Sequence, residues 1–287
     1  MTTNRAVPGP HTWQQVNLTF PDWTAAENVA IGCVAPILTV AEERGLIAGW
    51  FFVRKAPCWR IRYQPAGDPE AAQAHLHGRL GQLRDSGHLT AVTGAVYEPE
   101  ERAFGGPAAM TVAHRLFRDD SKHVLDYLAR TAAEPAIRRR RELAIILPSA
   151  MLRAAGLDWH EQGDVWATAA SHREPPASLP AISGTMTTLM TGTAVLAQNG
   201  NPGGITAGWE RAFTTAGRDL AGLAAAGQLH RGLRAVLARH ILFTWNRHGL
   251  PHAVQAVLAC EAASAVFGPD PAAAAVPVLD PADRHGR

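Results

Sequence analysis

The stretch WFFVRKAPCWRIRY, residues 50–63, decides the fold of this chain because it predicts the pairing of two strands. Two short runs rich in aromatic and β-branched residues, Trp50–Arg54 and Cys58–Tyr63, are separated by only three residues, one of them a proline. Runs of this kind on either side of a short turn are typical of a β-hairpin. We therefore expect an antiparallel pair of strands here, with the rest of a sheet built around it.

Side-chain alternation along this hairpin predicts two arginines that project side by side. Arg60 and Arg62 fall on one face of the second strand, opposite the apolar residues between and beside them. Arginine is rarely buried without an anion, and neighbouring arginines repel each other unless a carboxylate lies between them. The pair therefore indicates either an anion-binding site or an exposed sheet face with internal Arg–Glu pairs. Arg54, at the end of the first strand, is a further candidate for substrate binding.

The segment before the hairpin predicts a strand and a helix. A strand-like run at 13–20 is followed by Pro21 and Asp22, which provide a stop and a helix N-cap. The helix that follows carries apolar residues at helical spacing. We expect it to bend at Pro36 and to end at Gly45.

After the hairpin, a second helix is predicted from Asp68 to about Arg84 and a further strand from His88 to Tyr97. The resulting order is strand, helix, strand, strand, helix, strand. This order is that of a ferredoxin-like βαββαβ unit, an antiparallel sheet with both helices on one face. The fold class that we expect is therefore α+β.

Beyond Pro107 the pattern becomes helical. Alanine-rich segments with helical spacing cover about 107–156, 205–226, 229–248 and 250–266. Stretches rich in proline and glycine between them, Ser171–Pro180 and Asn199–Gly204, predict loops.

These patterns predict three parts within one continuous domain. Residues 1–106 form the ferredoxin-like part, residues 107–268 form a helical part, and residues 269–287 form a disordered tail. The free face of the sheet must be covered, so we expect the helical part to pack against it and to leave a cleft between the two.

Composition and charge exclude several classes of protein. The chain has 287 residues, 47% of them hydrophobic and 18% charged, which indicates a globular protein. A formal net charge of +2 is too small for nucleic-acid binding by bulk charge, so we expect no direct contact with nucleic acid. The three cysteines lack the spacing of a zinc site or a disulfide framework. With no signal-peptide pattern and no apolar run long enough for a membrane span, we expect a cytoplasmic protein without membrane contact.

The motif HILFTWNR begins with His240 and ends with Arg247, within a predicted helix. Seven residues are about two helical turns, so the two side chains share nearly the same face, roughly 10 Å apart along the axis. Such a pair could frame a substrate. A structural role for a single helical histidine is the alternative, because the pattern contains no information on its pKa.

The turn YEPEERAFGG, residues 97–106, joins the last predicted strand to the helical part. Glu98 and Glu101 are interpreted as solvated or helix-capping residues, whereas Glu100 is a candidate for substrate binding. The sequence contains no P-loop, GxSxG, HExxH or dinucleotide-binding pattern. These residues by themselves leave the reaction open.

Three motifs, WFFVRKAPCWRIRY, YEPEERAFGGPAAMTVAHRLFRDDS and HILFTWNR, follow one another in this order and closely resemble the C-terminal domain of lantibiotic dehydratases. The resemblance spans roughly residues 13–266. The same domain also occurs as a stand-alone thiopeptide-type bacteriocin biosynthesis protein. The resemblance implies the elimination of glutamate from a glutamylated Ser or Thr of a ribosomal precursor peptide, which leaves dehydroalanine or dehydrobutyrine.

Carried over to this sequence, the resemblance implies that Arg60, Arg62 and His240 are catalytic and that Glu100 is the family's loop glutamate. Guanidinium groups suit the negative charge that elimination develops, and a histidine can take or return a proton. No metal or redox cofactor is required. One position departs from the family pattern: many members have an arginine directly before the aromatic-Gly-Gly turn, where this chain has Ala103.

The resemblance also implies two partners. One is the precursor peptide, and the other is a separate tRNA-dependent glutamylation protein, because the chain is too short to include the large N-terminal half of a full dehydratase. A homodimer is left open.

The main rival function is that of a thiopeptide pyridine synthase, which joins two dehydroalanines in a formal cycloaddition and expels the leader peptide. The third is a non-catalytic module that binds the precursor. The retained arginine pair and histidine favour elimination, because cycloaddition creates no carboxylate leaving group.

Overall fold

The computed structural model describes residues 13–133, 139–174, 186–191 and 205–268. Within these ranges the chain forms a four-stranded antiparallel sheet with the order β2-β3-β1-β4. The strands are β1 (Gln14–Thr19), β2 (Ile47–Lys55), β3 (Cys58–Pro65) and β4 (Ala91–Ala95). The predicted hairpin is confirmed as the β2–β3 pair.

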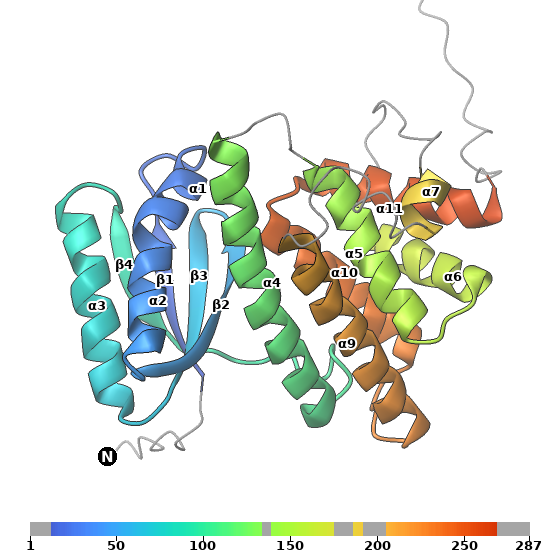
Figure 1. Ribbon diagram of the computed structural model, residues 1–287, viewed down its shortest axis with the longest axis horizontal. Helices are drawn as coiled ribbons and strands as arrows, with labels where there is room; N and C mark the ends of the chain where they lie inside the picture. Colours follow the sequence, from blue (N-terminus) through green and yellow to red (C-terminus); the bar gives the residue numbers. More distant parts are fainter. Residues whose placement is uncertain (1–12, 134–138, 175–185, 192–204, 269–287) are drawn as a thin grey trace, which may run out of the picture.

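Two helical segments cover one face of this sheet (Figure 1). The first runs from α1 (Ala26–Val29) through a π-helical turn (Ala30–Val34) into α2 (Ala35–Glu43), and the second is α3 (Pro69–Asp85). Pro36 lies in the first turn of α2 and has no backbone N–H, and a π-helical turn lies directly before this helix. The α3 helix begins as predicted, because the Asp68 carboxylate accepts a hydrogen bond from the Glu70 backbone N–H at 2.9 Å.

The hairpin register confirms the predicted alternation of side chains. Trp59 and Ile61 are buried in the main core under the helices. Arg62 lies opposite Phe51 and Arg60 opposite Val53. Directly opposed residues of an antiparallel pair share a face, so both arginines project away from the core that α2 and α3 cover.

The helical part lies along the β2 edge of the sheet (Figure 1). The α4 helix (Pro107–Ala133) is next to the sheet, and the Phe52 backbone N–H donates to Ser121 Oγ at 3.2 Å. The remaining helices are α5 (Arg140–Ala154), α6 (Trp159–Ala170), α7 (Met186–Thr191), α9 (Ile205–Ala225), α10 (Leu233–His248) and α11 (His252–Phe267). None of the described helices is long and apolar enough to cross a membrane.

A second, smaller apolar cluster joins the sheet to the helical part on the face that carries the two arginines. It contains Phe51 and Val53 of β2, Phe104 of the loop before α4, Phe117 of α4 and Phe243 of α10. The rings of Phe117 and Phe243 are stacked, with centroids 5.6 Å apart. This cluster, called here the aromatic junction, is the floor on which the candidate site is built.

The predicted α+β class is confirmed, whereas the ferredoxin-like description and the division at residues 106 and 107 stay predictions. The segment expected to be helical from 107 to 156 consists of α4 and α5, and those expected near 205–226, 229–248 and 250–266 are α9, α10 and α11. Most of the predicted Ser171–Pro180 loop, the whole Asn199–Gly204 turn and the tail 269–287 lie outside the described residues.

Candidate active site

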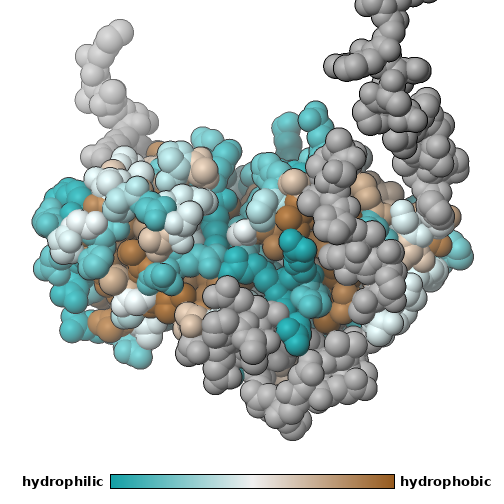
Figure 2. All heavy atoms as spheres, turned by 90° about the horizontal axis from the view of Figure 1, so that it is seen from above, coloured by the Kyte–Doolittle hydropathy of each residue, from teal (hydrophilic) through white to brown (hydrophobic). Residues whose placement is uncertain are grey.

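A cavity of about 940 Å³ lies between the end of the β2–β3 hairpin and helix α10. Four of the six site residues predicted from the sequence line it, and these are Arg54, Arg60, Arg62 and Glu100. Apolar side chains of Trp59, Leu242 and Phe243 line other parts of its wall. In Figure 2 hydrophilic side chains gather between the sheet and the helical part. The cavity is thus lined by residues of both the sheet and the helical part.

The cavity carries an excess of positive charge. Its lining cations are Arg54, Lys55, Arg60, Arg62, Arg173 and Arg239. Its lining carboxylates are Glu27 and Glu100, and both are already in ion pairs with arginines. An anionic ligand would therefore enter a site where unneutralised guanidinium groups are in excess.

Arg62 is held in a fixed orientation. Its side chain is almost buried, and Nε donates to Gln15 Oε1 at 2.8 Å. The guanidinium stacks over the Tyr97 ring, with 4.4 Å between Cζ and the ring centroid. Burial lowers the pKa of Arg62, and the positive charge of Arg60 lowers that pKa further. Arginine nevertheless stays charged at working pH, so Arg62 is a preorganised cation.

Arg54 lies at the hairpin end of the cavity, with a side chain that is only 7% exposed. It is ion-paired with Glu27, which also accepts two hydrogen bonds from Arg140 at 3.0 and 2.8 Å. Burial lowers the pKa of Arg54 to about 10, although the Glu27 carboxylate opposes this shift. The Arg54 guanidinium covers the face of Trp59, with 4.4 Å between Cζ and the ring centroid.

Glu100 and Arg239 close the cavity from the other side. Glu100 stands in the loop before α4, and its carboxylate is ion-paired with Arg239 of α10. Arg239 was not predicted from the sequence, and neither was Arg173, whose Nε donates to Gln255 Oε1 at 2.8 Å. For Arg239 a signal was present in the sequence. It is spaced three, four and seven residues before Leu242, Phe243 and Asn246, which places all four on one helical face.

His240 lies on the inner face of α10 and not among the residues that line the cavity. It is fully buried in the aromatic junction, with its ring centroid 4.9 Å from that of Phe104 and 6.0 Å from that of Phe117. Neither ring nitrogen has a hydrogen-bond partner. Burial, with the nearby charge of Arg247, lowers the pKa of His240 to about 3, so its imidazole is neutral.

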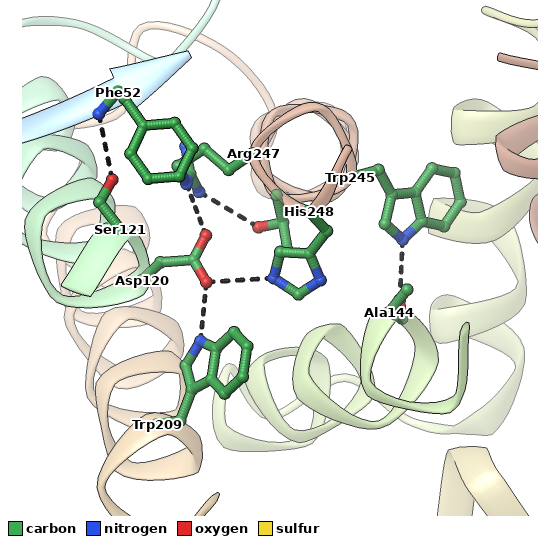
Figure 3. Close-up of polar contacts among 9 residues, drawn as sticks. Phe52, Asp120, Ser121, Ala144, Trp209, Trp245, Arg247 and His248 are labelled. Carbon is green, nitrogen blue, oxygen red and sulfur yellow. Dashed lines mark hydrogen bonds and ion pairs between the residues drawn. The ribbon is translucent and has the colours of Figure 1, made fainter. Parts of the chain in front are cut away.

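Arg247 shares the inner face of α10 with His240, as their spacing predicts, and it too lies outside the cavity. It is fully buried, and its Nε donates to Asp120 Oδ2 at 2.5 Å. Figure 3 shows the Asp120 carboxylate between Arg247, His248 and Trp209. The Trp209 Nε1–H donates to Asp120 Oδ1 at 2.7 Å, and His248 Nε2 lies 3.2 Å from the same oxygen. The contacts of Arg247 are therefore those of a residue that joins α10 to α4.

Comparison with protein-family models gives a match over residues 13–266, to lantibiotic biosynthesis dehydratase C-term. The chain belongs to this family. The match covers the sheet, the cavity and the helical part up to α11. No curated protein matches the sequence.

Solved structures of this fold include members with different activities. The dehydratase MibB of Microbispora sp. 107891, a tRNA-dependent lantibiotic dehydratase, superposes with a TM-score of 0.70 at 20% identity over 91% of this chain. This chain spans only 28% of the length of MibB. The pyridine synthase TbtD from thiomuracin biosynthesis superposes with a TM-score of 0.63 at 13% identity, over 90% of this chain and 99% of TbtD. TsrL superposes with a TM-score of 0.54 at 14% identity, over 91% of this chain and 99% of TsrL. At these identities the likeness shows the fold alone.

Within the family, two further features of this chain bear on its chemistry. Ala103, at the position where the family resemblance leads one to expect an arginine, packs against the aromatic junction. The described residues contain no group of three or more His, Cys, Asp or Glu side chains that could hold a metal ion. Among the residues that line the cavity, five are arginines.

Proposed function

We propose that the chain catalyses β-elimination of glutamate from glutamylated Ser or Thr residues of a ribosomal precursor peptide. The product is dehydroalanine or dehydrobutyrine in a lanthipeptide or thiopeptide-type bacteriocin, and the enzyme is a lyase. The observation that carries this proposal is the pair Arg60 and Arg62, side by side in a cavity where cations outnumber carboxylates. Such a cavity suits a reaction that expels a carboxylate.

In the proposed reaction a base removes the α proton of the esterified residue. The electron pair forms the Cα–Cβ double bond, the Cβ–O bond breaks, and glutamate leaves as a carboxylate. Negative charge develops on the neighbouring carbonyl oxygen and on the leaving group, and preorganised guanidiniums can stabilise it by several kcal/mol, on the order of 3. Arg60 and Arg62 are the proposed donors, and Arg54, Glu100 and Arg247 stay proposed substrate-binding residues.

His240 is the proposed acid/base. Its neutral imidazole keeps one nitrogen as an acceptor and the other as a donor, and neither is used by the protein. A buried polar group without a partner is costly, which supports a functional reason for a histidine at this position. Because the ring packs against Phe104, the proposal requires that substrate entry opens the aromatic junction.

The proposal includes a cytoplasmic reaction on a precursor peptide that a separate tRNA-dependent protein has glutamylated. The test is a chemically glutamylated precursor incubated with the protein in the absence of tRNA. Wild type should release glutamate and yield the dehydrated peptide, which mass spectrometry detects. Arg62→Lys should slow this step about 100-fold, because ammonium lacks the planar fork. Arg44→Lys, at an exposed position outside the cavity, is the matched control.

A second candidate, the pyridine synthase reaction, is favoured by one observation: His240 does not line the cavity. Cycloaddition between two dehydroalanines has no carboxylate leaving group and so makes less use of the arginine pair. A protein that leaves the glutamyl ester intact but cyclises a peptide bearing two dehydroalanines would reject elimination and establish this second function.

A further inference from the structure

The hairpin end of the cavity contains guanidinium hydrogens that the protein does not use. Arg54 is more than nine-tenths buried, yet its Nε and Nη2 have no hydrogen-bond partner, and only Nη1 is paired with Glu27. Both atoms are themselves buried, although they belong to a side chain that lines the cavity. Buried donors of a charged group are costly when left unpaired, so these two donors suit a ligand oxygen.

Surrounding residues hold this guanidinium in place. Trp59 lies under its face, and Gly249, in the left-handed conformation with φ 70°, lies against its edge. A Cβ at Gly249 would collide with Arg54 Nη1, so the glycine leaves the space that the guanidinium occupies. The neighbouring Lys55 also lines the cavity and adds a second cation.

This end is separate from the arginine pair. The register pairs Arg62 with Phe51 and Arg54 with Trp59, so the two arginines are three strand positions apart and leave the hairpin on opposite faces, although both line the cavity. At about 3.3 Å per residue this is about 10 Å along the strand. A glutamyl group is one residue long, whereas about three residues of extended peptide are needed to cover this offset along the strand.

We propose that Arg54 and Lys55 form a subsite for a carboxylate of the precursor peptide itself, about three residues from the Ser or Thr that reacts. The carboxylate would accept the Nε and Nη2 hydrogens of Arg54 as a bidentate pair, a geometry that guanidinium favours. The inference rests on the proposed function in taking a peptide as the substrate and the arginine pair as the place where its Ser or Thr reacts. This subsite would direct the enzyme to Ser and Thr residues at a set distance from an acidic residue of the peptide.

The test measures binding and involves no glutamate elimination. The probes are short peptides with a central serine and otherwise uncharged side chains. Each carries one glutamate, placed at each position in turn on either side of the serine. Each has a counterpart with glutamine in place of that glutamate. For wild type, the glutamate peptide should bind about tenfold more tightly than its counterpart when the acid is about three residues away. Arg54→Gln should abolish this preference. Arg44→Gln, an exposed arginine outside the cavity, should keep it.

Two further variants keep the test decisive if Arg54→Gln does not fold. Lys55→Gln, at an exposed position, should weaken the preference a few-fold, and Glu27→Gln should strengthen it by removing the carboxylate that competes for Arg54. The proposal is overturned if wild type shows no preference for glutamate at any position, or if the preference is unchanged in these variants. It is also overturned if free glutamate competes with the peptides through Arg54, which would assign Arg54 to the glutamyl group. Loss of elimination with this preference intact would reject the proposed function alone.

Discussion

Asp120 and Arg247 form a fully buried ion pair that joins α4 to α10, with 2.5 Å between Arg247 Nε and Asp120 Oδ2. The next residue of α4, Ser121, accepts the Phe52 backbone N–H of strand β2. The same short segment of α4 therefore fixes both the hairpin with the arginine pair and the helix with His240 (Figure 3). Burial raises the pKa of Asp120, but Arg247 and His248 outweigh this effect and hold the pKa at about 2. The carboxylate therefore stays charged.

Asp120→Asn should destabilise the protein by about 3–5 kcal/mol, because it leaves the Arg247 charge buried without a counterion. Urea unfolding followed by circular dichroism measures this loss. Asp219→Asn is the matched control, since Asp219 pairs with Arg115 at the surface and such pairs contribute about 0–1 kcal/mol. Equal effects of the two substitutions would contradict the structural role assigned to Asp120.

His240→Phe should leave the free energy of unfolding unchanged or raise it, while abolishing glutamate elimination. The imidazole has two unpartnered nitrogens in an aromatic environment, and a phenyl ring there removes the cost of burying them. His160→Phe, at an exposed position, should affect neither property. Full elimination activity in the His240 variant would remove this residue from the acid/base role.

The same histidine should make stability dependent on pH. Its pKa is about 3 in the folded state and 6.5 ordinarily, so the unfolded state binds the proton more readily. The contribution of His240 is complete above about pH 6.5 and is lost progressively as the pH falls toward about 3. The difference in unfolding free energy between wild type and His240→Phe should therefore grow as the pH falls through this window. A difference that stays constant with pH would contradict the buried, neutral state of the imidazole.

Gly249→Ala should cost about 1 kcal/mol more than Gly227→Ala. Both glycines have left-handed φ angles, 70° and 67°, so both substitutions carry a similar backbone strain. Only at Gly249 does the added Cβ meet a side chain, that of Arg54, whereas Gly227 faces open space. In an Arg54→Ala background the difference between the two substitutions should disappear, which a double-mutant cycle of unfolding measurements detects.

Gln15→Leu should lower kcat for glutamate elimination about tenfold with little change in KM. Gln15 Oε1 accepts the Arg62 Nε–H, so its loss frees the guanidinium to rotate away from the cavity. Gln15→Glu, which keeps an acceptor for Nε, should recover most of the activity. Gln14→Leu alters the neighbouring residue and serves as the control, because Gln14 makes no bond to Arg62.

Local patterns predicted most of the elements, and one missed helix had a readable signal. Asp68 followed by Pro69 marked the start of α3, and the two runs of the hairpin marked β2 and β3. The α6 helix was not predicted, although Asp158 and Glu161 form a capping box at its start, a pattern visible in the sequence. Arg173 gave no such signal, because its contact with Gln255 spans 82 positions.

For the candidate site, the sequence by itself determined which side chains share a face. Strand alternation places Arg60 and Arg62 together, and helical spacing places His240 with Arg247. Only the tertiary structure decided which face meets the cavity. On α10 it is the Arg239 face, while the His240 face turns inward because Arg247 finds a counterion in Asp120, 127 positions away in the chain. Periodicity cannot reveal such a partner, because a buried charge is stabilised by contacts that form only when distant segments pack together.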